Sequence, residues 1–165
     1  GILRNRGLSI KIYIAGNASS AYIHELFALA DRQGVSDLVN YKGVLSRKEA
    51  IALASQCSIG LVPHLPYGNN LAAWPVKMME YMALGLPLVY SNLPSHMSIA
   101  AGREIGLSVD ATQPMQIANA IERLMLDPHL RRRASEAGKK AVTEMYNWGL
   151  ESKKLLGLYE KVLRR

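Results

Sequence analysis

The chain has 165 residues, of which 49% are hydrophobic, so it can bury one sizeable core and its length is typical of a single domain. Its net charge of +7 favours anionic partners without choosing among nucleotides, nucleic acid and acidic lipid. We find no secretory signal and no apolar run of the roughly 18 residues that a membrane-spanning helix needs. The single cysteine, Cys57, excludes an intramolecular disulfide and is expected to be a buried structural thiol in a reducing, cytoplasmic environment.

Short β-rich runs alternate with helical patterns along the whole chain. In chain order, we predict a strand at 10–15, a helix at about 20–33, a strand at 38–41, a helix at about 47–56, a strand at 58–62, a helix at 75–84, strands at 88–90 and 107–109, and helices at 114–126, 128–146 and 148–163. Alternating apolar strands and helices predict a parallel sheet covered on both faces. The expected fold is therefore α/β, a Rossmann-like doubly wound parallel sheet, in one domain over residues 1–165.

The helix that starts at Pro75 is the most informative segment. Proline suits the first helical position, and Gly85 is expected to end the helix in a left-handed cap. Lys77 and Glu80 then share one face near the helix N-terminus, where unpaired N–H groups favour an anion. A lysine there can hold a diphosphate, and a carboxylate one turn further can accept hydrogen bonds from ribose hydroxyls. Spacing alone, however, favours an ordinary surface lysine–glutamate pair.

Ligands of parallel α/β sheets bind beyond the carboxyl ends of the strands, which makes the loops at those ends candidate binding segments. Gly16 permits close backbone approach in the first loop, although no GxGxxG pattern is present and a plain helix-capping turn is at least as good an account. In the second loop, Ser46 and Glu49 predict a capping box. Asn69 and Asn70 in the third loop are typical of a solvated turn.

Two histidines and three methionines are weaker candidates. His64 and His96 are expected in loops at the ligand edge, where either can contact a ligand. Met78, Met79 and Met82 are predicted to face the core rather than a cofactor. No cluster of His, Cys, Asp and Glu has the spacing of metal ligands, so no structural metal is expected.

Three separated runs, in a fixed order, carry a family resemblance: "YKGVLSRKEAIALASQCSIGLVPHLPYGN", "PVKMMEYMALGLPLVYSN" and "NWGLESKKLLGLYEKVL". They resemble the C-terminal, donor-binding half of the retaining glycosyltransferases of family four, which have the two-domain GT-B architecture. The resemblance covers nearly the whole chain. It implies that this chain is the nucleotide-sugar-binding domain, and that an N-terminal acceptor-binding domain and a first strand lie outside it.

The resemblance assigns the loops after the first two strands to the donor. The backbone of the second loop reads the nucleotide base in such enzymes, which makes Val44 and Leu45 the expected base contacts. Gly16 and Asn17, in the first loop, are expected substrate-binding residues.

The resemblance also assigns roles on the helix after Pro75. Many relatives carry two glutamates eight positions apart; the second matches Glu80, whereas the first falls on Ala72. The chain instead resembles a subgroup with Pro-x-Lys-x-x-Glu-Tyr, in which we infer that Lys77 supplies what backbone amides supply elsewhere. Lys77 and Glu80 are therefore the expected catalytic residues, with Val76 beside them in the substrate site. What replaces the first glutamate is left open.

The implied function is transfer of a hexose, with retention, from a nucleotide diphosphate sugar to a polysaccharide or lipid-linked acceptor. No cofactor is expected, and the fragment alone is expected to be inactive. Two alternatives are a sugar-nucleotide epimerase of similar architecture and a non-catalytic nucleotide-sugar-binding module. No acid–base set for the epimerase is evident. Nucleic acid is disfavoured as a partner because the basic residues lack interleaved exposed aromatics.

The C-terminal part of the chain is strongly basic. From His129 to Arg165 there are ten Lys or Arg residues against four Glu. Anionic membrane lipid is a candidate partner for this surface, which would place a cytoplasmic protein peripherally on the inner face of the membrane; a merely solvated surface is the simpler alternative. The run 131–133 is expected to be a solvated helix face, and Asn147 is expected to cap the last helix.

The sheet order makes a further prediction. In a doubly wound sheet of order 3-2-1-4-5-6, the strands at 10–15 and 58–62 run parallel without direct hydrogen bonds, at roughly 9–10 Å. A strand from outside these 165 residues would fill the gap, and residues 1–6 would be the tail of the helix that follows that strand.

Overall fold

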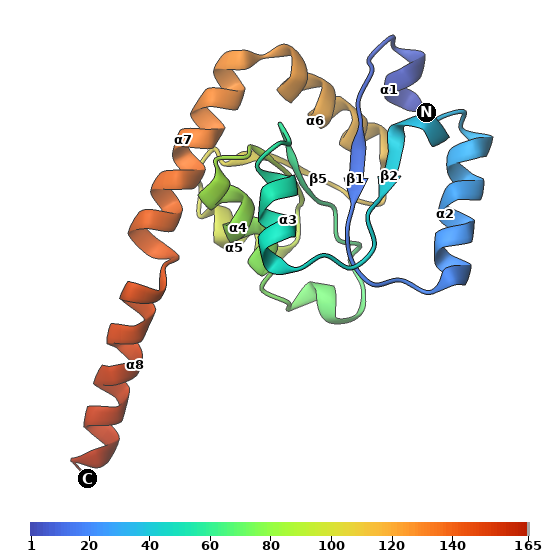
Figure 1. The fold of residues 1–165 in the computed structure, drawn as a ribbon. Helices are drawn as coiled ribbons and strands as arrows, with labels where there is room; N and C mark the ends of the chain where they lie inside the picture. The colour runs from blue at the N-terminus through green and yellow to red at the C-terminus, as the bar shows by residue number, and fades with distance from the viewer. Residues whose placement is uncertain (165) are drawn as a thin grey trace. The chain divides into compact units, whose positions relative to one another are not determined.

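The computed structural model describes residues 1–164, which fall into two compact units divided between residues 56 and 57 (Figure 1). The boundary between the units lies after the third helix. In both units the strands are parallel and helices connect them. The predicted class, α/β with Rossmann-like parallel sheets, is therefore confirmed.

The first unit contains one pair of strands. Its elements are α1 (Ile2–Asn5), β1 (Ile12–Ile14), α2 (Ser20–Arg32), the 3-10 turn η1 (Ser36–Leu38), β2 (Val39–Tyr41) and α3 (Arg47–Ala54). Ile12 lies opposite Val39, and Ile14 lies opposite Tyr41. The short α1 agrees with the expectation of a helix tail at the start of the chain.

The second unit is larger and contains a three-stranded sheet of order β3-β4-β5. Its elements are β3 (Gly60–Val62), the 3-10 turn η2 (Gly68–Leu71), α4 (Val76–Leu84), β4 (Leu88–Ser91), α5 (Pro94–Ala100), β5 (Gly106–Val109), α6 (Pro114–Leu126), α7 (Pro128–Met145) and α8 (Trp148–Leu163). Helix α4 contacts β3 and β4, whereas α6 contacts β4 and β5. Because the three strands are parallel, their carboxyl ends lie at the same edge of the sheet.

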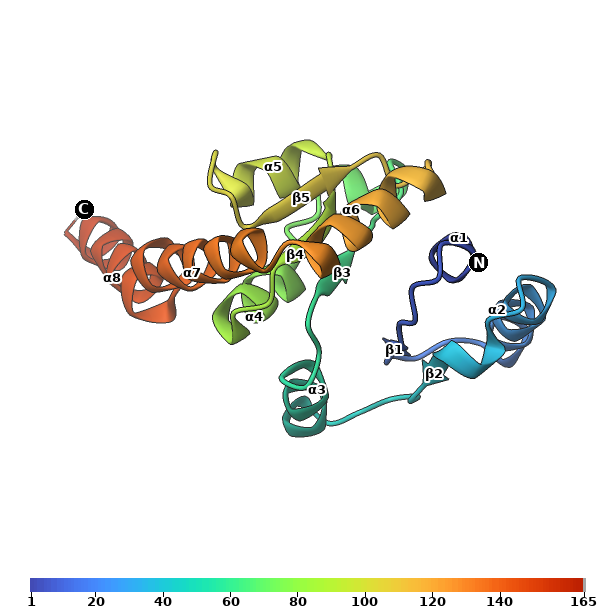
Figure 2. The same cartoon turned by 90° about the horizontal axis from the view of Figure 1, so that it is seen from above.

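The core of the second unit forms where α4 meets the sheet and α7 (Figure 2). Met78 and Met82 are 0% exposed on the inner side of α4. Gly138 allows α7 to approach closely, because a Cβ atom there would lie 3.3 Å from Met82 Cγ. The prediction that Met78 and Met82 face the core is thus confirmed, whereas Met79 is only half-buried.

The ends of α4 follow the sequence signals with one correction. Gly85 has φ 75° and ψ 25°, and the N–H of Leu86 donates to the carbonyl of Tyr81 at 2.9 Å, so the predicted left-handed cap is confirmed. Pro75 is the N-cap rather than the first helical residue, which is Val76. Proline has no N–H to donate, and its ψ of 95° is still extended, so the helix starts one residue later.

Helix α5 was not predicted, and it overturns the expectation for His96. This residue lies within α5, not in a loop, and its side chain is buried. Leu93 occupies the N-cap without a side-chain hydrogen bond, so the usual polar signal of a helix start is missing.

The predicted order of the strands across the two units stays a prediction. The described residues form one ladder in each unit, β1-β2 in the first and β3-β4-β5 in the second. The spacing of about two strands between β1 and β3, and the strand that would fill it, remain predictions.

The basic C-terminal helices differ from the expectation of a plain solvated face. The guanidinium of Arg131 donates to the carbonyls of Leu124 and Met125 at the end of α6, and Arg133 pairs with Glu104 at 3.0 Å. Arg132 and Arg133 are exposed and match the predicted solvated face, whereas Arg131 is half-buried. Helix α8 extends away from the sheet and has no buried residue (Figures 1 and 2).

Within residues 1–164, no helix combines the length and apolar character needed to cross a bilayer.

Candidate functional site

The partial positive charge at the N-terminus of helix α4 is not neutralised by a side chain of α4 or of its N-cap. No side chain caps it, and its first turn contains no acidic residue. The N–H groups of a first helical turn and the helix dipole give this end a partial positive charge. Lys77, the second residue of α4, adds a full positive charge and is exposed. This end of α4 is therefore suited to an anion.

Glu80 lies one turn after Lys77 and is also exposed. Three residues along a helix place both side chains on one face. Among residues 1–164, neither side chain forms an ion pair with the other or with a third residue. The ordinary surface pair that the spacing favoured is not formed, so both charged groups are available to a ligand.

Two histidines lie beside Lys77 at the carboxyl ends of β3 and β4. The buried Ser91 hydroxyl, at the end of β4, donates to the carbonyl of His64 at 2.6 Å and so fixes the loop after β3. On α5, the hydroxyl of Ser95 lies 3.2 Å from Nδ1 of His96. The two imidazole rings meet nearly at right angles (87°), with 5.1 Å between centroids.

The surroundings hold both histidines in the neutral form near pH 7. Burial, and then the positive charge of Lys77, lower the pKa of His64 below its ordinary value. Burial, followed by the charges of His64 and Lys77, lowers the pKa of His96 to about 4. Because α4 connects the parallel strands β3 and β4, its first turn with Lys77 lies at the carboxyl edge of the sheet, where His64 and His96 also follow strands.

The loops of the first unit form a second group of predicted residues. The N–H of Gly16 donates to the carbonyl of Gly43 at 2.8 Å, and the Tyr41 hydroxyl donates to the carbonyl of Gly16 at 2.7 Å. Gly16 has φ 145°, a conformation that favours glycine. Val44 is 74% exposed beside this junction. The structure thus joins the turns after β1 and β2.

Capping fixes both of these turns. The predicted capping box is confirmed: the Ser46 N–H donates to the carboxylate of Glu49 at 2.8 Å, and the Glu49 N–H donates to the Ser46 hydroxyl at 3.3 Å. These bonds from Ser46 lower the pKa of Glu49. At the start of α2, Ser19 accepts from the N–H of Tyr22 at 3.2 Å. Leu45 is half-buried directly before the box.

The predicted site residues therefore fall into two groups. Those of the first unit are Gly16, Asn17, Val44 and Leu45, and those of the second unit are Val76, Lys77 and Glu80. Sequence reasoning left His64 and His96 as weak candidates, because only the tertiary fold places them beside Lys77.

The loop before α4 contains the turn that its asparagines predicted. The side-chain amide of Asn70 donates to the carbonyl of Leu65 at 3.1 Å, and the carbonyl of Asn69 accepts from Ala72 and Ala73. Ala72 ends η2 and is exposed.

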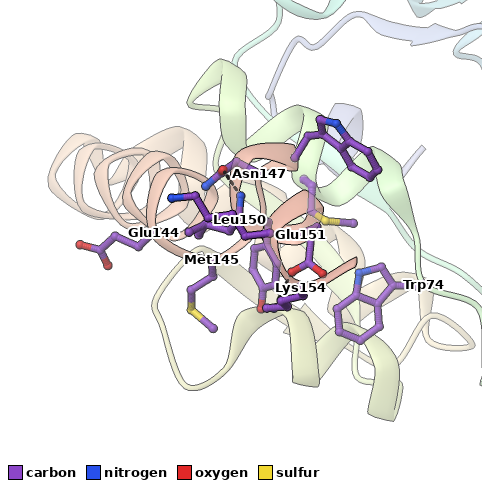
Figure 3. A pocket seen from close by; sticks show the side chains of 11 residues that line it. Trp74, Glu144, Met145, Asn147, Leu150, Glu151 and Lys154 are labelled. Atoms are coloured by element: carbon purple, nitrogen blue, oxygen red, sulfur yellow. Dashed lines mark hydrogen bonds and ion pairs between the residues drawn. The ribbon is translucent and has the colours of Figure 1, made fainter. Parts of the chain in front are cut away.

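A separate cavity of about 800 Å³ lies where α7 meets α8 (Figure 3). Its lining residues are Trp74, Met79, Glu144, Met145, Tyr146, Asn147, Trp148, Leu150, Glu151, Lys153 and Lys154. Asn147 caps α8 as predicted and accepts from the N–H of Leu150 at 3.1 Å. The sequence analysis did not predict this cavity, and none of the predicted site residues lines it. The lining tryptophans are Trp74, in the loop before α4, and Trp148, the first residue of α8.

Residues 1–164 contain no group of three or more His, Cys, Asp and Glu side chains arranged to hold a metal ion. Cys57 is half-buried, and burial raises the pKa of its thiol, which agrees with a structural rather than a reactive cysteine.

A parallel α/β fold and an anion-suited helix start are features that many phosphate-binding domains share. Comparison with known proteins then gives the family. Residues 2–141 match the model of the family "Glycosyl transferases group 1". The chain belongs to this family.

Curated relatives include an MMP alpha-(1->4)-mannosyltransferase from Mycolicibacterium hassiacum, which is 27% identical over 80% of this chain and 31% of that protein. An alpha-D-kanosaminyltransferase from Streptomyces kanamyceticus is 25% identical over 97% of this chain and 40% of its own length. The chain therefore spans only about a third to two-fifths of the length of these relatives.

Solved structures with the same fold include a sucrose-phosphate synthase from Thermosynechococcus elongatus, with a TM-score of 0.79 and 22% identity over 93% of this chain and 39% of that chain. Anabaena HepE in complex with UDP-glucose has a TM-score of 0.75 and 16% identity over 92% of this chain and 41% of its own.

Proposed function

We propose that this chain binds the nucleotide diphosphate sugar donor of a retaining glycosyltransferase of family four, which transfers a hexose to a polysaccharide or lipid-linked acceptor. The observation that carries the proposal is the uncapped start of α4, where the side chain of Lys77 forms no ion pair with any other residue of 1–164. Membership of the group 1 family supports it, as does the fold shared with Anabaena HepE, whose structure was solved in complex with UDP-glucose. Neither the epimerase nor the non-catalytic module is favoured by the family match.

Lys77 and Glu80 have different roles in this proposal. Lys77 and the first N–H groups of α4, from Val76 onward, hold the diphosphate. Glu80, one turn further in, accepts hydrogen bonds from the ribose hydroxyls and so orients the donor. In the subgroup with Pro-x-Lys-x-x-Glu-Tyr, the lysine would take over what a glycine-rich backbone supplies in other relatives.

The first unit would supply the rest of the donor site. We assign base contacts to Val44 and Leu45, whose turn is held rigid by the adjacent capping box. Gly16 and Asn17 lie on the turn joined to it and are assigned to the donor as well. Backbone contacts from a fixed turn can select a base with little loss of entropy on binding.

Catalysis would rest on stabilising the departing diphosphate. As the bond between the anomeric carbon and the phosphate oxygen breaks, the electron pair stays on that oxygen, and negative charge grows on the diphosphate. A preorganised positive group at such a position typically contributes about 10²- to 10³-fold to a rate. Lys77 and the α4 terminus supply this charge in the proposal, which therefore calls for no cofactor.

The acceptor side is assigned to protein outside this chain, because the relatives are more than twice as long. An N-terminal domain of the same protein would bind the acceptor there, and the isolated chain would be inactive in transfer. For the cellular setting we propose the cytoplasm, with the basic residues of α7 and α8 facing anionic lipid.

Calorimetry tests the donor assignment directly. The full chain is titrated with the diphosphates of uridine, guanosine and adenosine, with their hexose conjugates, and with the matching nucleosides. One base should be preferred, and its diphosphate should bind much more tightly than its nucleoside. Failure of every diphosphate to bind would contradict the proposal.

A further inference from the structure

Two histidine ring nitrogens at the carboxyl edge of the second unit's sheet are buried without a hydrogen-bond partner among residues 1–164. They are Nδ1 of His64 and Nε2 of His96, and the whole side chain of His96 is 0% exposed. Native proteins pair nearly all buried polar atoms, because an unpaired one costs free energy. Two such atoms in neighbouring rings therefore call for an explanation.

Neighbouring hydroxyl groups hold the backbone of His64 and contact the ring of His96. The Ser91 hydroxyl holds the backbone of His64, and Ser95 lies within hydrogen-bond distance of Nδ1 of His96. The rings stand edge to face at 87°. His96 is thus a buried support for His64, whose own ring is only half-buried.

Protonation of the half-buried ring follows from its surroundings. Burial, and then the charge of Lys77, lower the pKa of His64, so its ring is neutral and carries one proton. A buried donor without a partner is rarer in proteins than a buried acceptor without one. The proton is therefore expected on Nε2, which leaves the buried Nδ1 as the acceptor and makes Nε2 an N–H donor.

The charges around this donor select an anion as its acceptor. Lys77 and the uncapped start of α4 contribute positive charge, and the first turn of α4 contains no acidic side chain. A metal cation bound by the two imidazoles would be repelled by the same groups. A phosphoryl oxygen can accept from both the imidazole and the ammonium.

We propose that His64 is a further donor-binding residue, whose Nε2 donates a hydrogen bond to a phosphoryl oxygen of the nucleoside diphosphate held by Lys77. His96 is a positioning residue that acts through His64 by holding its ring in place. This inference rests on the proposed function, to which it adds a second phosphate contact.

The first test replaces the donor nitrogen. In the full chain, His64→Ala should weaken binding of the preferred nucleoside diphosphate about tenfold and leave nucleoside binding unchanged. His64→Gln places an amide N–H near the position of Nε2 and should retain most of the affinity, whereas His64→Asn, whose amide corresponds to Nδ1, should not. Unchanged diphosphate affinity in His64→Ala, or an equal loss for the nucleoside, would overturn the assignment.

The second test examines whether His96 holds the ring of His64 in place. His96→Leu removes the ring at similar volume and should weaken diphosphate binding several-fold, whereas His96→Phe keeps a ring and should restore it. In the His64→Ala background, His96→Leu should cause no additional loss. Additive losses, or wild-type affinity in His96→Leu, would refute the positioning role. Thermal melting of each variant reports whether the fold is retained.

Two further outcomes separate this inference from the proposed function. If Lys77→Ala weakens diphosphate binding while every histidine variant binds like wild type, the proposed function stands and the inference fails. If no nucleoside diphosphate binds, both fail. Titration with Zn²⁺ alone tests the alternative that His64 and His96 bind a metal ion. If His64→Ala loses zinc binding but binds the diphosphate like wild type, the two histidines are a metal site and the inference is overturned.

Discussion

Replacing Lys77 with alanine isolates the contribution of one charge at the start of α4. Alanine is the best helix former, so the change does not weaken α4 through propensity. The side chain is exposed and makes no ion pair within residues 1–164, so no folded-state partner is left unsatisfied. Any loss of affinity can therefore be assigned to the ligand contact.

The size of the expected loss follows from the exposure of the site. A charge-assisted hydrogen bond contributes about 1.5–3 kcal/mol, and solvent screening at an exposed lysine favours the low end of that range. At 1.4 kcal/mol for each factor of ten, Lys77→Ala should raise the Kd of a nucleoside diphosphate about 10- to 30-fold. The Kd of the corresponding nucleoside should stay within a factor of two or so.

Calorimetry at low and high salt measures this difference. Screening should shrink the gap between wild type and Lys77→Ala as the salt concentration rises. Lys161→Ala, which removes an exposed lysine of α8, is the matched control and should bind as wild type does. Equal losses for nucleoside and diphosphate would show that Lys77 acts on folding or on the base, and would refute the reasoning.

Four other predictions address the remaining parts of the account. Glu80→Gln should reduce affinity for ribonucleotides but spare 2′,3′-dideoxy analogues; a dideoxy compound that loses as much affinity would leave Glu80 with a structural role. Met82→Ala should lower the free energy of unfolding by about 2–5 kcal/mol, since this side chain is fully buried, and half-buried Met79→Ala should cost clearly less in the same denaturant titration. His96 has a pKa of about 4 in the folded chain, so as pH falls below about 6.5 the unfolded chain binds a proton at this residue before the folded chain does. The free energy of unfolding should therefore drop by about 2 kcal/mol from pH 8 to pH 5 through His96. The His96→Phe variant should not show that part of the drop. Finally, sedimentation with anionic vesicles should show salt-sensitive binding through α7 and α8; its absence would remove lipid from the proposed partners.

Local signals in the sequence were sufficient for most element boundaries. Helices α6 and α8 start and end where predicted, because Pro114 and Asn147 mark their first turns unambiguously. The capping box at Ser46 and the left-handed Gly85 are also purely local. Strands β1, β2 and β3 were predicted too long, and β4 and β5 were each predicted one residue too short, because the extent of a ladder depends on partner strands that are distant in sequence.

Features that depend on the tertiary structure were missed or underestimated. The seven residues of α5 are too few to show a periodic pattern and have no polar N-cap, so His96 was expected in a loop. The grouping of His64, His96 and Lys77 arises only when the ends of β3, α4 and α5 meet. Each histidine was only a weak candidate from the sequence, because neither belongs to a motif of its own.

A structure of the full chain with its preferred nucleoside diphosphate tests the central claim most directly. The account predicts that the diphosphate lies at the start of α4, with a phosphoryl oxygen within hydrogen-bond distance of Lys77 Nζ and the ribose hydroxyls at Glu80. A diphosphate bound elsewhere, for example in the cavity between Trp74 and Trp148, with Lys77 left in solvent, would contradict it.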